Sequence, residues 1–336
     1  MSHVVNAKAT TESPMQELFA PIRAELVAVE QALRDELHSD APFVDELLQY
    51  GCLLGGKRLR PALLLMTAKA VGTMTADHIK LAAVVEMIHT ATLVHDDILD
   101  EADMRRHLAT VNSRWDNQTS VLLGDYLFTH AFYLSSTLDS TYACRTIGEA
   151  TNTVCEGELR QVGNRGNFGL TEAEYFRIIG AKTAALCACC CQLGAHYAGA
   201  DEETVARLSQ FGFDLGVAFQ IADDVLDLVG DESDTGKSLG TDLEKQKATL
   251  PIIHMLSQVS GREKAQMLEL LDTESPSTQT RSQLAEWLDR YQSIAYTQQV
   301  ARDRAERARM ALEPLPDSPA RNVLEMITHF VVSRSH

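Results

Sequence analysis

The chain has 336 residues and a formal net charge of −17, from 47 acidic and 30 basic residues. This surplus of negative charge excludes a general affinity for nucleic acid or anionic lipid surfaces, so a phosphate-bearing substrate needs local basic clusters or bridging cations. Hydrophobic residues make up 45% and charged residues 23%, which predicts a globular protein with a substantial core.

Residues 1–13 are polar and small, and we expect them to form a disordered tail. They lack the apolar core of a secretory signal. No uninterrupted apolar run long enough to span a bilayer appears further along the chain. We therefore expect a cytoplasmic protein with no transmembrane segment.

From residue 14 onward nearly every segment carries apolar residues at spacings of three and four, and strand-like alternation is scarce. Helices are expected over 15–37, 59–71, 77–101, 118–137, 141–162, 172–199 and 202–229. Two polar, glycine-bearing loops interrupt this pattern, 162–170 and 230–249, and the second is a candidate flap because it directly follows an acidic helix end. The sequence predicts an all-α fold in which residues 14–336 form a single large helical domain.

The segment LVHDDILDEADMRR places Asp96, Asp97 and Asp100 near the end of an apolar helix. Asp96 and Asp100 are about 6 Å apart along the axis and on nearly the same face, so both can bind one cation or a cation pair. Like charges at this spacing repel, and acids near a helix C-terminus oppose its dipole. We therefore expect positive groups to compensate them.

A second cluster, in FQIADDVLDLVGD, contains Asp223, Asp224 and Asp227 between apolar flanks. One such cluster alone is as readily explained by an acidic surface helix. Two clusters in hydrophobic helices predict a site for Mg²⁺, which combines a few carboxylates with water and phosphate oxygens.

Basic residues are localised near these carboxylates. The segment GGKRLRP carries cations at a helix start, where unpaired amides favour an anion, although a solvated basic turn is an equal alternative. The candidate cations and their neighbours are Lys57, Arg58, Arg60, Arg105, Arg106, Lys182 with Thr183, Lys237 and Lys247.

Four of the seven cysteines, Cys187, Cys189, Cys190 and Cys191, lie in one helical stretch. Their side chains point in different directions, so they cannot form a tetrahedral metal site from one helix. We interpret them as small buried residues at a tight helix contact in a reducing compartment.

The ordered motifs GGKRLRP, HTATLVHDDILDEADMRR, GDYL, EGE, AKTAAL, FQIADDVLD and GKSLGTDLEKQKATLP resemble those of bacterial trans-polyprenyl diphosphate synthases, most closely the long-chain octaprenyl type. The resemblance spans roughly residues 50–255. It implies a helical bundle of the isoprenoid synthase type with a central active-site cavity. It also implies condensation of isopentenyl diphosphate with an allylic diphosphate such as farnesyl diphosphate, three Mg²⁺ ions, and a homodimer.

The resemblance also implies roles for individual residues. Metal binding falls to Asp96, Asp100, Asp223 and Asp227. The isopentenyl diphosphate site comprises Lys57, Arg60, His89 and Arg106, and the allylic site comprises Arg105, Lys182, Thr183, Gln220, Lys237 and Lys247. The catalytic set is Asp96, Asp97, Asp100, Arg105, Lys182, Asp223 and Asp224.

The chain departs from the family pattern in two loops. It has His107 and Ala109 where the family commonly has Gly and Pro, and Gln246 where the family commonly has Gly before Lys247. These differences leave the shape of both loops and the role of Lys247 open.

The positions one turn upstream of Asp96, Ala91 and Thr92, are expected to limit product length because one isoprene unit is about one helical turn long, ~5 Å. Neither is aromatic, which favours a long product of C30 to C50, with C40 the first expectation. Phe132 or Leu134 on a neighbouring helix is expected either to form a deeper floor or simply to belong to the core.

Two rival functions remain. A class I terpene cyclase shares helices, an aspartate motif and Mg²⁺, but its second metal site typically uses Asn, Ser and Glu. A non-catalytic partner subunit tends to lose one aspartate cluster, whereas this chain keeps both.

Overall fold

The computed structural model describes residues 18–53, 56, 58–105, 108–229, 240–273 and 277–333. The N-terminal half contains η1 (Ala20–Ile22), α2 (Arg23–Glu36), α3 (Pro42–Leu53), α4 (Leu59–Val71), α5 (Ala76–Leu99), β1 (Met104–Arg105), β2 (Leu108–Ala109), α6 (Val111–Arg114), α7 (Asn117–Ser136) and α8 (Tyr142–Gly163). The C-terminal half contains α9 (Glu172–Ile179), η2 (Gly180–Ala184), α10 (Ala185–Tyr197), α11 (Glu202–Val229), α13 (Thr241–Glu244), α14 (Leu250–Ser257), α15 (Gly261–Leu271), α16 (Thr278–Arg290), α17 (Ser293–Leu312) and α18 (Pro319–Ser333).

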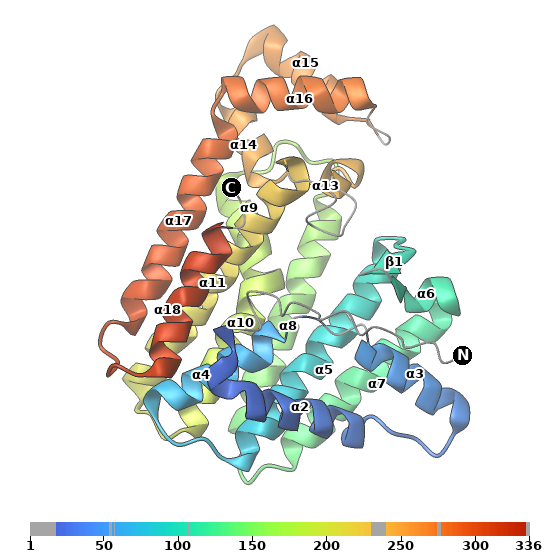
Figure 1. The fold of residues 1–336 in the computed structure, drawn as a ribbon. Coiled ribbons are helices and arrows are strands. Elements are labelled where there is room, and N and C mark those ends of the chain that lie inside the picture. Colours follow the sequence, from blue (N-terminus) through green and yellow to red (C-terminus); the bar gives the residue numbers. More distant parts are fainter. Residues whose placement is uncertain are drawn as a thin grey trace, which may run out of the picture.

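The all-α fold predicted from the sequence is confirmed (Figure 1). Two helices begin and end where the spacing of apolar residues predicted, α4 and α11. In the described part of the chain, β1 and β2 form the regular strand structure, a short antiparallel hairpin that pairs Met104 with Ala109. The expected tail, residues 1–13, lies outside the described residues.

The segment expected to be one helix over 172–199 is divided. Its start is fixed by a capping box in which the Thr171 side chain and the Glu174 side chain each accept from the other's backbone amide. A π-helical turn, η2, then separates α9 from α10. Such turns insert one extra residue into a helix and often occur at functional sites.

The long helices pack closely around α10, which contacts α4, α5, α8 and α11. At Gly212 on α11, a Cβ atom would lie 2.5 Å from the carbonyl oxygen of Cys187, so only glycine permits this approach. Cys187, Cys189, Cys190 and Cys191 are all buried free thiols. The interpretation of this cysteine stretch as a tight helix contact is therefore confirmed.

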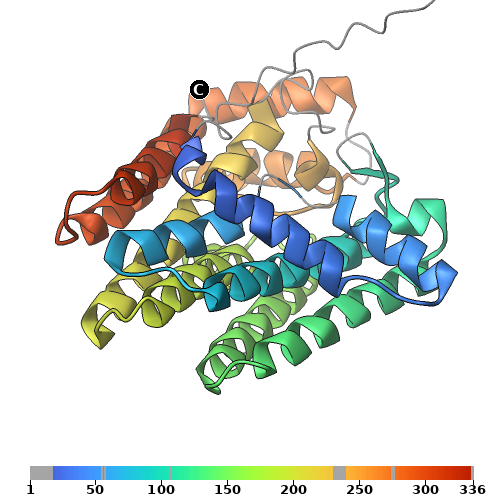
Figure 2. The same cartoon turned by 60° about the horizontal axis from the view of Figure 1, so that its bottom comes forward.

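Buried hydrophobic side chains form two clusters, and α11 and α17 contribute to both of them. The larger cluster lies among α2, α4, α5, α7, α8, α10, α11 and α18. The smaller one lies beneath α15 and α16, which sit at one end of the molecule above α14 (Figure 1). The view in Figure 2 shows α2 and α3 lying across α5, which they cover on that face.

The stretch Glu172–Tyr197 is the one helical run of the described residues long and apolar enough to cross a membrane. Within the bundle, 72% of its apolar window is buried, as in the core helix of a globular protein. This burial accounts for its hydrophobicity without a bilayer. The cytoplasmic location stays a prediction.

Candidate active site

A central cavity of about 320 Å³ lies among α4, α5, α8, α10 and α11. Asp96 from the first aspartate cluster and Asp223 from the second both line it. Both clusters therefore reach one shared space, which the proposed metal chemistry requires. We call this space the active-site cavity.

The lining changes character along the cavity. At one level it carries Asp96 on α5, Glu158 on α8, Lys182 and Thr183 in η2, and Asp223 on α11. One helical turn away, the same walls carry Thr92, Val154, Cys187 and Phe219. The active-site cavity thus has a charged end at the aspartates and a less polar end one turn away, which suits a substrate with an ionic head and a hydrocarbon tail. Arg58, Arg60, Glu86 and His89 also contribute to its lining.

The first aspartate cluster divides between two roles. Asp97 is buried, and Arg105 donates to it from Nη2 at 2.7 Å and from Nε at 2.9 Å. Arg105 is the compensating positive group that the sequence predicted. Asp100, at the C-terminus of α5, pairs with Nζ of Lys245 at 3.0 Å. Asp96 keeps its carboxylate at the active-site cavity.

Lys182 joins Asp96 to Glu158. Its Nζ atom lies 2.9 Å from Glu158 and 3.7 Å from Asp96. At Gly157 a Cβ atom would lie 2.6 Å from the backbone nitrogen of Lys182, so this glycine lets α8 approach η2 closely. Glu158 was part of a recognised motif, but sequence reasoning gave it no role, because only the fold places it against Asp96.

Burial and neighbouring charges shift the pKa values of the carboxyl groups around the active-site cavity. Burial, together with repulsion from Asp100, raises the pKa of Asp96 against the opposing effect of Lys182. Burial and the nearby Asp96 carboxylate likewise raise the pKa of Glu158. Burial also acts on Asp100, but the ammonium groups of Lys247 and Lys245 outweigh it and lower the pKa of that carboxyl. Excess negative charge at Asp96 and Glu158 makes this end of the cavity attractive to cations.

The three carboxylates of the second cluster have different partners. Asp223 lines the active-site cavity. Asp224 is buried and accepts from the Tyr175 hydroxyl at 2.6 Å and from Nε2 of Gln220 at 2.8 Å. Burial, followed by repulsion from Asp242, raises the pKa of Asp224 to about 8.

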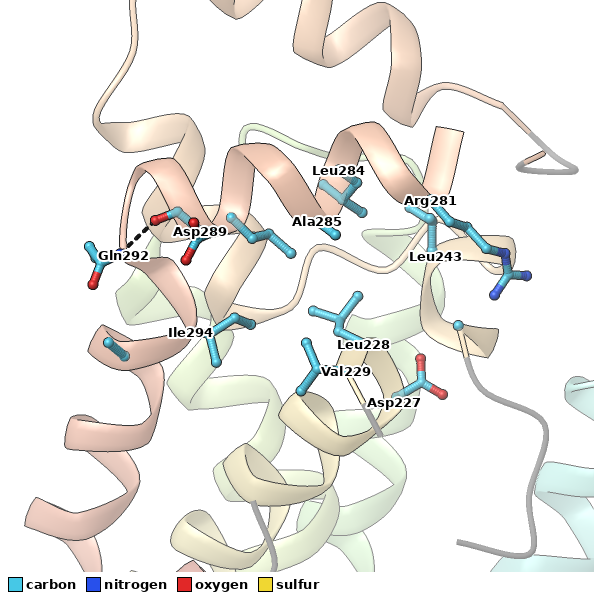
Figure 3. A pocket seen from close by; sticks show the side chains of 13 residues that line it. Asp227, Leu228, Val229, Leu243, Arg281, Leu284, Ala285, Asp289, Gln292 and Ile294 are labelled. Carbon is cyan, nitrogen blue, oxygen red and sulfur yellow. Dashed lines mark hydrogen bonds between the residues drawn. The ribbon is translucent and has the colours of Figure 1, made fainter. Parts of the chain in front are cut away.

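Asp227 caps the short helix α13. Its carboxylate accepts from the Thr241 hydroxyl at 2.9 Å and from the backbone nitrogen of Asp242 at 3.0 Å. It also borders a second pocket, of about 470 Å³, together with Leu228, Val229 and residues of α16 (Figure 3). The structure therefore places Asp227 beside the second pocket rather than in the lining of the active-site cavity.

Several predicted substrate-binding residues meet at the active-site cavity. Arg60, His89, Arg105, Lys182, Thr183, Gln220 and Lys247 all line it. Nε of Arg60 is buried and has no hydrogen-bond partner among the described residues, so it is a donor available to an anion. Lys57, Arg106 and Lys237 lie outside the described residues.

Arg58, two residues before Arg60, makes ion pairs that stabilise the fold. Its φ of 53° lies in the left-handed region, and its guanidinium pairs with Glu30 and, at 2.6 Å, with the buried Glu86. These ion pairs hold the start of α4, where Arg60 enters the active-site cavity.

The residues expected to limit product length differ in whether they line the active-site cavity. Thr92 lines the active-site cavity, and its hydroxyl donates to the backbone oxygen of His89 at 2.8 Å. Ala91 is fully buried and is not in the lining. Phe132 is half-buried against the larger hydrophobic cluster, and Leu134 belongs to that cluster.

The donor set fits Mg²⁺. Carboxylate oxygens of Asp96 and Asp223 face one cavity from different helices, and Mg²⁺ prefers such hard oxygen ligands. Within the described ranges, no three His, Cys, Asp or Glu side chains come close enough to hold a metal ion by themselves. An ion held here would take its remaining ligands from water and from substrate oxygens, as Mg²⁺ commonly does at phosphate sites.

An all-helical bundle with two aspartate-bearing helices facing one partly apolar cavity defines the class of enzymes that act on prenyl diphosphates. The polyprenyl synthetase family model matches residues 41–288. The octaprenyl diphosphate synthase of Escherichia coli (strain K12) is 37% identical over 310 residues, which cover 92% of this chain and 96% of that protein.

Solved structures agree. A decaprenyl diphosphate synthase from Rhodobacter capsulatus superposes with a TM-score of 0.91 at 35% identity, covering 96% of this chain and all of that one. A polyprenyl synthase from Caulobacter crescentus CB15, complexed with calcium and isoprenyl diphosphate, gives a TM-score of 0.89 at 33% identity, covering 98% of this chain and 100% of the other. The chain belongs to the polyprenyl synthetase family, and it is a trans-prenyltransferase that condenses isopentenyl diphosphate with an allylic diphosphate.

Proposed function

We propose that this enzyme is a Mg²⁺-dependent synthase of a long all-trans polyprenyl diphosphate, of C30 to C50 and most simply C40. The observation that carries the proposal is the shared lining of the active-site cavity by Asp96 and Asp223, with Lys182 between the walls. Relatives in support include the E. coli octaprenyl synthase and an all-trans-nonaprenyl-diphosphate synthase of R. capsulatus, 35% identical.

Asp96 and Asp223 would hold Mg²⁺, while Asp100 pairs with Lys245 and Asp227 caps α13. When bound, the metal supplies Lewis-acid neutralisation of the diphosphate leaving group. Lys182 and Arg60, which both line the active-site cavity, add positive charge, so that the allylic C–O bond ionises and the double bond of isopentenyl diphosphate attacks the cation. A proton is then lost to the released diphosphate, and no nucleophilic side chain is needed.

A long product is supported by the less polar end of the active-site cavity. Thr92, Val154 and Cys187 are small or medium-sized, which leaves room for the first added units beside the larger Phe219. The next turn of the same walls carries Ile88, Ala150, Cys191 and Leu215, all buried. A C40 chain must therefore displace this aliphatic floor as it grows.

The deciding experiment is incubation of the purified chain with farnesyl and isopentenyl diphosphates, with and without Mg²⁺, followed by mass spectrometry of the products. We expect chains beyond C20 with Mg²⁺ and none after chelation with EDTA. Products that stop at C20 would refute the long-chain proposal. A hydrocarbon product would favour a terpene cyclase, and absence of any product would favour a partner subunit.

We propose a homodimer from the exposed apolar side chains of α7 and α8. Leu122 and Tyr133 on α7 are 60% and 63% exposed, and Leu159 on α8 is 73% exposed. Such side chains on adjacent helices are typical of interfaces. Analytical ultracentrifugation should give a dimer for the wild type and a monomer for Leu122→Glu/Leu159→Glu, while Val27→Glu, also at an exposed position, should leave the dimer intact.

A further inference from the structure

A chain of hydrogen bonds connects Tyr175 on α9 to the active-site cavity. The Tyr175 hydroxyl donates to Oδ2 of Asp224 at 2.6 Å, and Oδ1 of Asp224 accepts from Nε2 of Gln220 at 2.8 Å. Oε1 of Gln220 in turn accepts from the Thr183 hydroxyl at 2.8 Å. Gln220 and Thr183 line the active-site cavity, whereas Tyr175 and Asp224 are absent from its lining.

The order of donors and acceptors along these hydrogen bonds fixes the orientation of the Gln220 amide. Tyr175 is buried and donates its only proton to Asp224. In its ionised form Asp224 accepts on both oxygens, and Gln220 then turns its NH₂ group toward Asp224 and its carbonyl toward Thr183, as the structure has it. The rotamer of Thr183 follows from that choice. Tyr175 thus lies at the start of the hydrogen bonds that orient the Gln220 amide and the Thr183 hydroxyl, both in the lining of the active-site cavity.

The same hydrogen bonds connect three segments of the backbone. Tyr175 lies on α9, Asp224 and Gln220 lie one turn apart on α11, and Thr183 lies in η2. Since η2 directly follows α9, the bonds close a ring from α9 through α11 and back to the π-helical turn that carries Lys182. Loss of the bond at Tyr175 opens this ring at its end remote from the active-site cavity.

We propose that Tyr175 is a positioning residue for the allylic diphosphate, acting through Asp224 on Gln220 and Thr183. We also propose that Asp224 belongs to this series of hydrogen bonds and does not bind metal. The inference rests on the proposed function, because it takes the allylic site to include Gln220 and Thr183. It assigns the two adjacent carboxylates different tasks. Asp223 faces the active-site cavity, and Asp224 orients its wall.

The structure offers a matched control in Tyr296 on α17. Its hydroxyl also donates to a carboxylate oxygen, Oε2 of Glu172 at 2.9 Å, and Glu172 lies on α9 as Tyr175 does. Neither Tyr296 nor Glu172 lines the active-site cavity. Tyr296→Phe therefore removes a hydrogen bond of the same kind from the same helix without touching the proposed chain.

The test compares steady-state kinetics and thermal unfolding of the full-length wild type, Tyr175→Phe and Tyr296→Phe, with farnesyl and isopentenyl diphosphates as substrates. For Tyr175→Phe we expect the KM for farnesyl diphosphate to rise roughly 10-fold, the range typical of outer-sphere partners, with the KM for isopentenyl diphosphate unchanged. Tyr296→Phe should leave both KM values unchanged. A Tyr175→Phe enzyme with both KM values unchanged would overturn the inference.

Asp224→Asn supplies a second route if Tyr175→Phe folds poorly. Asn can still accept from Tyr175, but it presents an NH₂ group to Gln220 and so reverses that amide. We expect the same selective rise in the KM for farnesyl diphosphate, at an unchanged Mg²⁺ requirement. A higher Mg²⁺ requirement with the KM for farnesyl diphosphate unchanged would identify Asp224 as a metal ligand and overturn the inference. A wild type that forms no condensation product would instead refute the proposed function.

Discussion

Arg105 donates to both carboxylate oxygens of Asp97, at 2.9 and 3.1 Å from Nε, and so neutralises the buried neighbour of Asp96. Two adjacent aspartates in one motif are thereby separated. Asp97 is neutralised inside the protein, and Asp96 is left to face the active-site cavity.

Substitution should distinguish these roles. Asp97→Ala leaves the Arg105 guanidinium without its partner and should lower the free energy of unfolding by about 3 kcal/mol, as removal of one member of a buried pair does. Asp96→Asn should reduce kcat/KM by about 10³-fold, a loss on the scale of removing one group that stabilises transition-state charge, while the urea midpoint changes little. Equal stability losses in the two variants would contradict the assignment.

Enlarging Thr92 should shorten the product. Thr92→Phe places an aromatic ring in the active-site cavity one turn from Asp96, and we expect the main product to fall to C20 or below by mass spectrometry. Ala91→Phe is the control at the neighbouring position. Because Ala91 is fully buried outside the lining, its enlargement should mainly cost about 1–3 kcal/mol of stability through overpacking. Shortening by Ala91→Phe alone would place the growing chain on the other side of α5.

Gln246→Gly should stabilise the protein. Gln246 has a φ of 52°, a left-handed conformation that costs an L-residue about 1–2 kcal/mol. Glycine avoids this cost but loses about 0.4–1 kcal/mol through the entropy of the unfolded chain, so a net gain of about 0.5–1 kcal/mol is expected in urea unfolding. Gln246→Ala keeps the left-handed strain and should show no gain. A gain in the alanine variant would trace the effect to the side chain instead.

Stability should fall on mild acidification because of His78. Its ring is buried, Nδ1 accepts from the backbone nitrogen of Thr75 at 2.9 Å, and Nε2 lies 3.3 Å from the carbonyl oxygen of Gly194. Burial lowers the pKa of His78 below its ordinary value. As the pH falls through about 6.5, the unfolded chain takes up a proton that the folded protein does not, so the unfolding free energy decreases.

Thermal unfolding between pH 7.5 and 5.5 checks this sign. The wild type should lose stability across the interval, and His78→Gln should show a shallower loss. Parallel curves for the two proteins would assign the pH dependence to other groups.

Much of the fold follows from the sequence. Apolar spacing predicts α4 and α11 to the residue, and the paired aspartate clusters predict a shared cation site, which the lining of one cavity by Asp96 and Asp223 supports. Local patterns carry this information because each helix buries its own apolar face.

The remaining features depend on contacts between distant segments. No spacing rule predicts which aspartate of the first cluster Arg105 neutralises, that Asp224 binds Tyr175, or that Glu158 meets Lys182. Adjacent residues on a helix point about 100° apart, so the members of one aspartate motif reach different neighbours, and only tertiary packing decides which. The π-helical turn likewise leaves no local signature in AKTAAL.

That turn has a consequence for protein engineering. The π-helical turn absorbs one extra residue, so deleting one residue from Gly180–Ala184 would restore an uninterrupted α-helix with little rotation of α10 relative to α9. The deletion would instead shift Lys182 and Thr183, which lie inside the turn, away from Glu158 and Gln220. Chimaeras that exchange this region with a relative must therefore transfer α9, η2 and α10 as one piece.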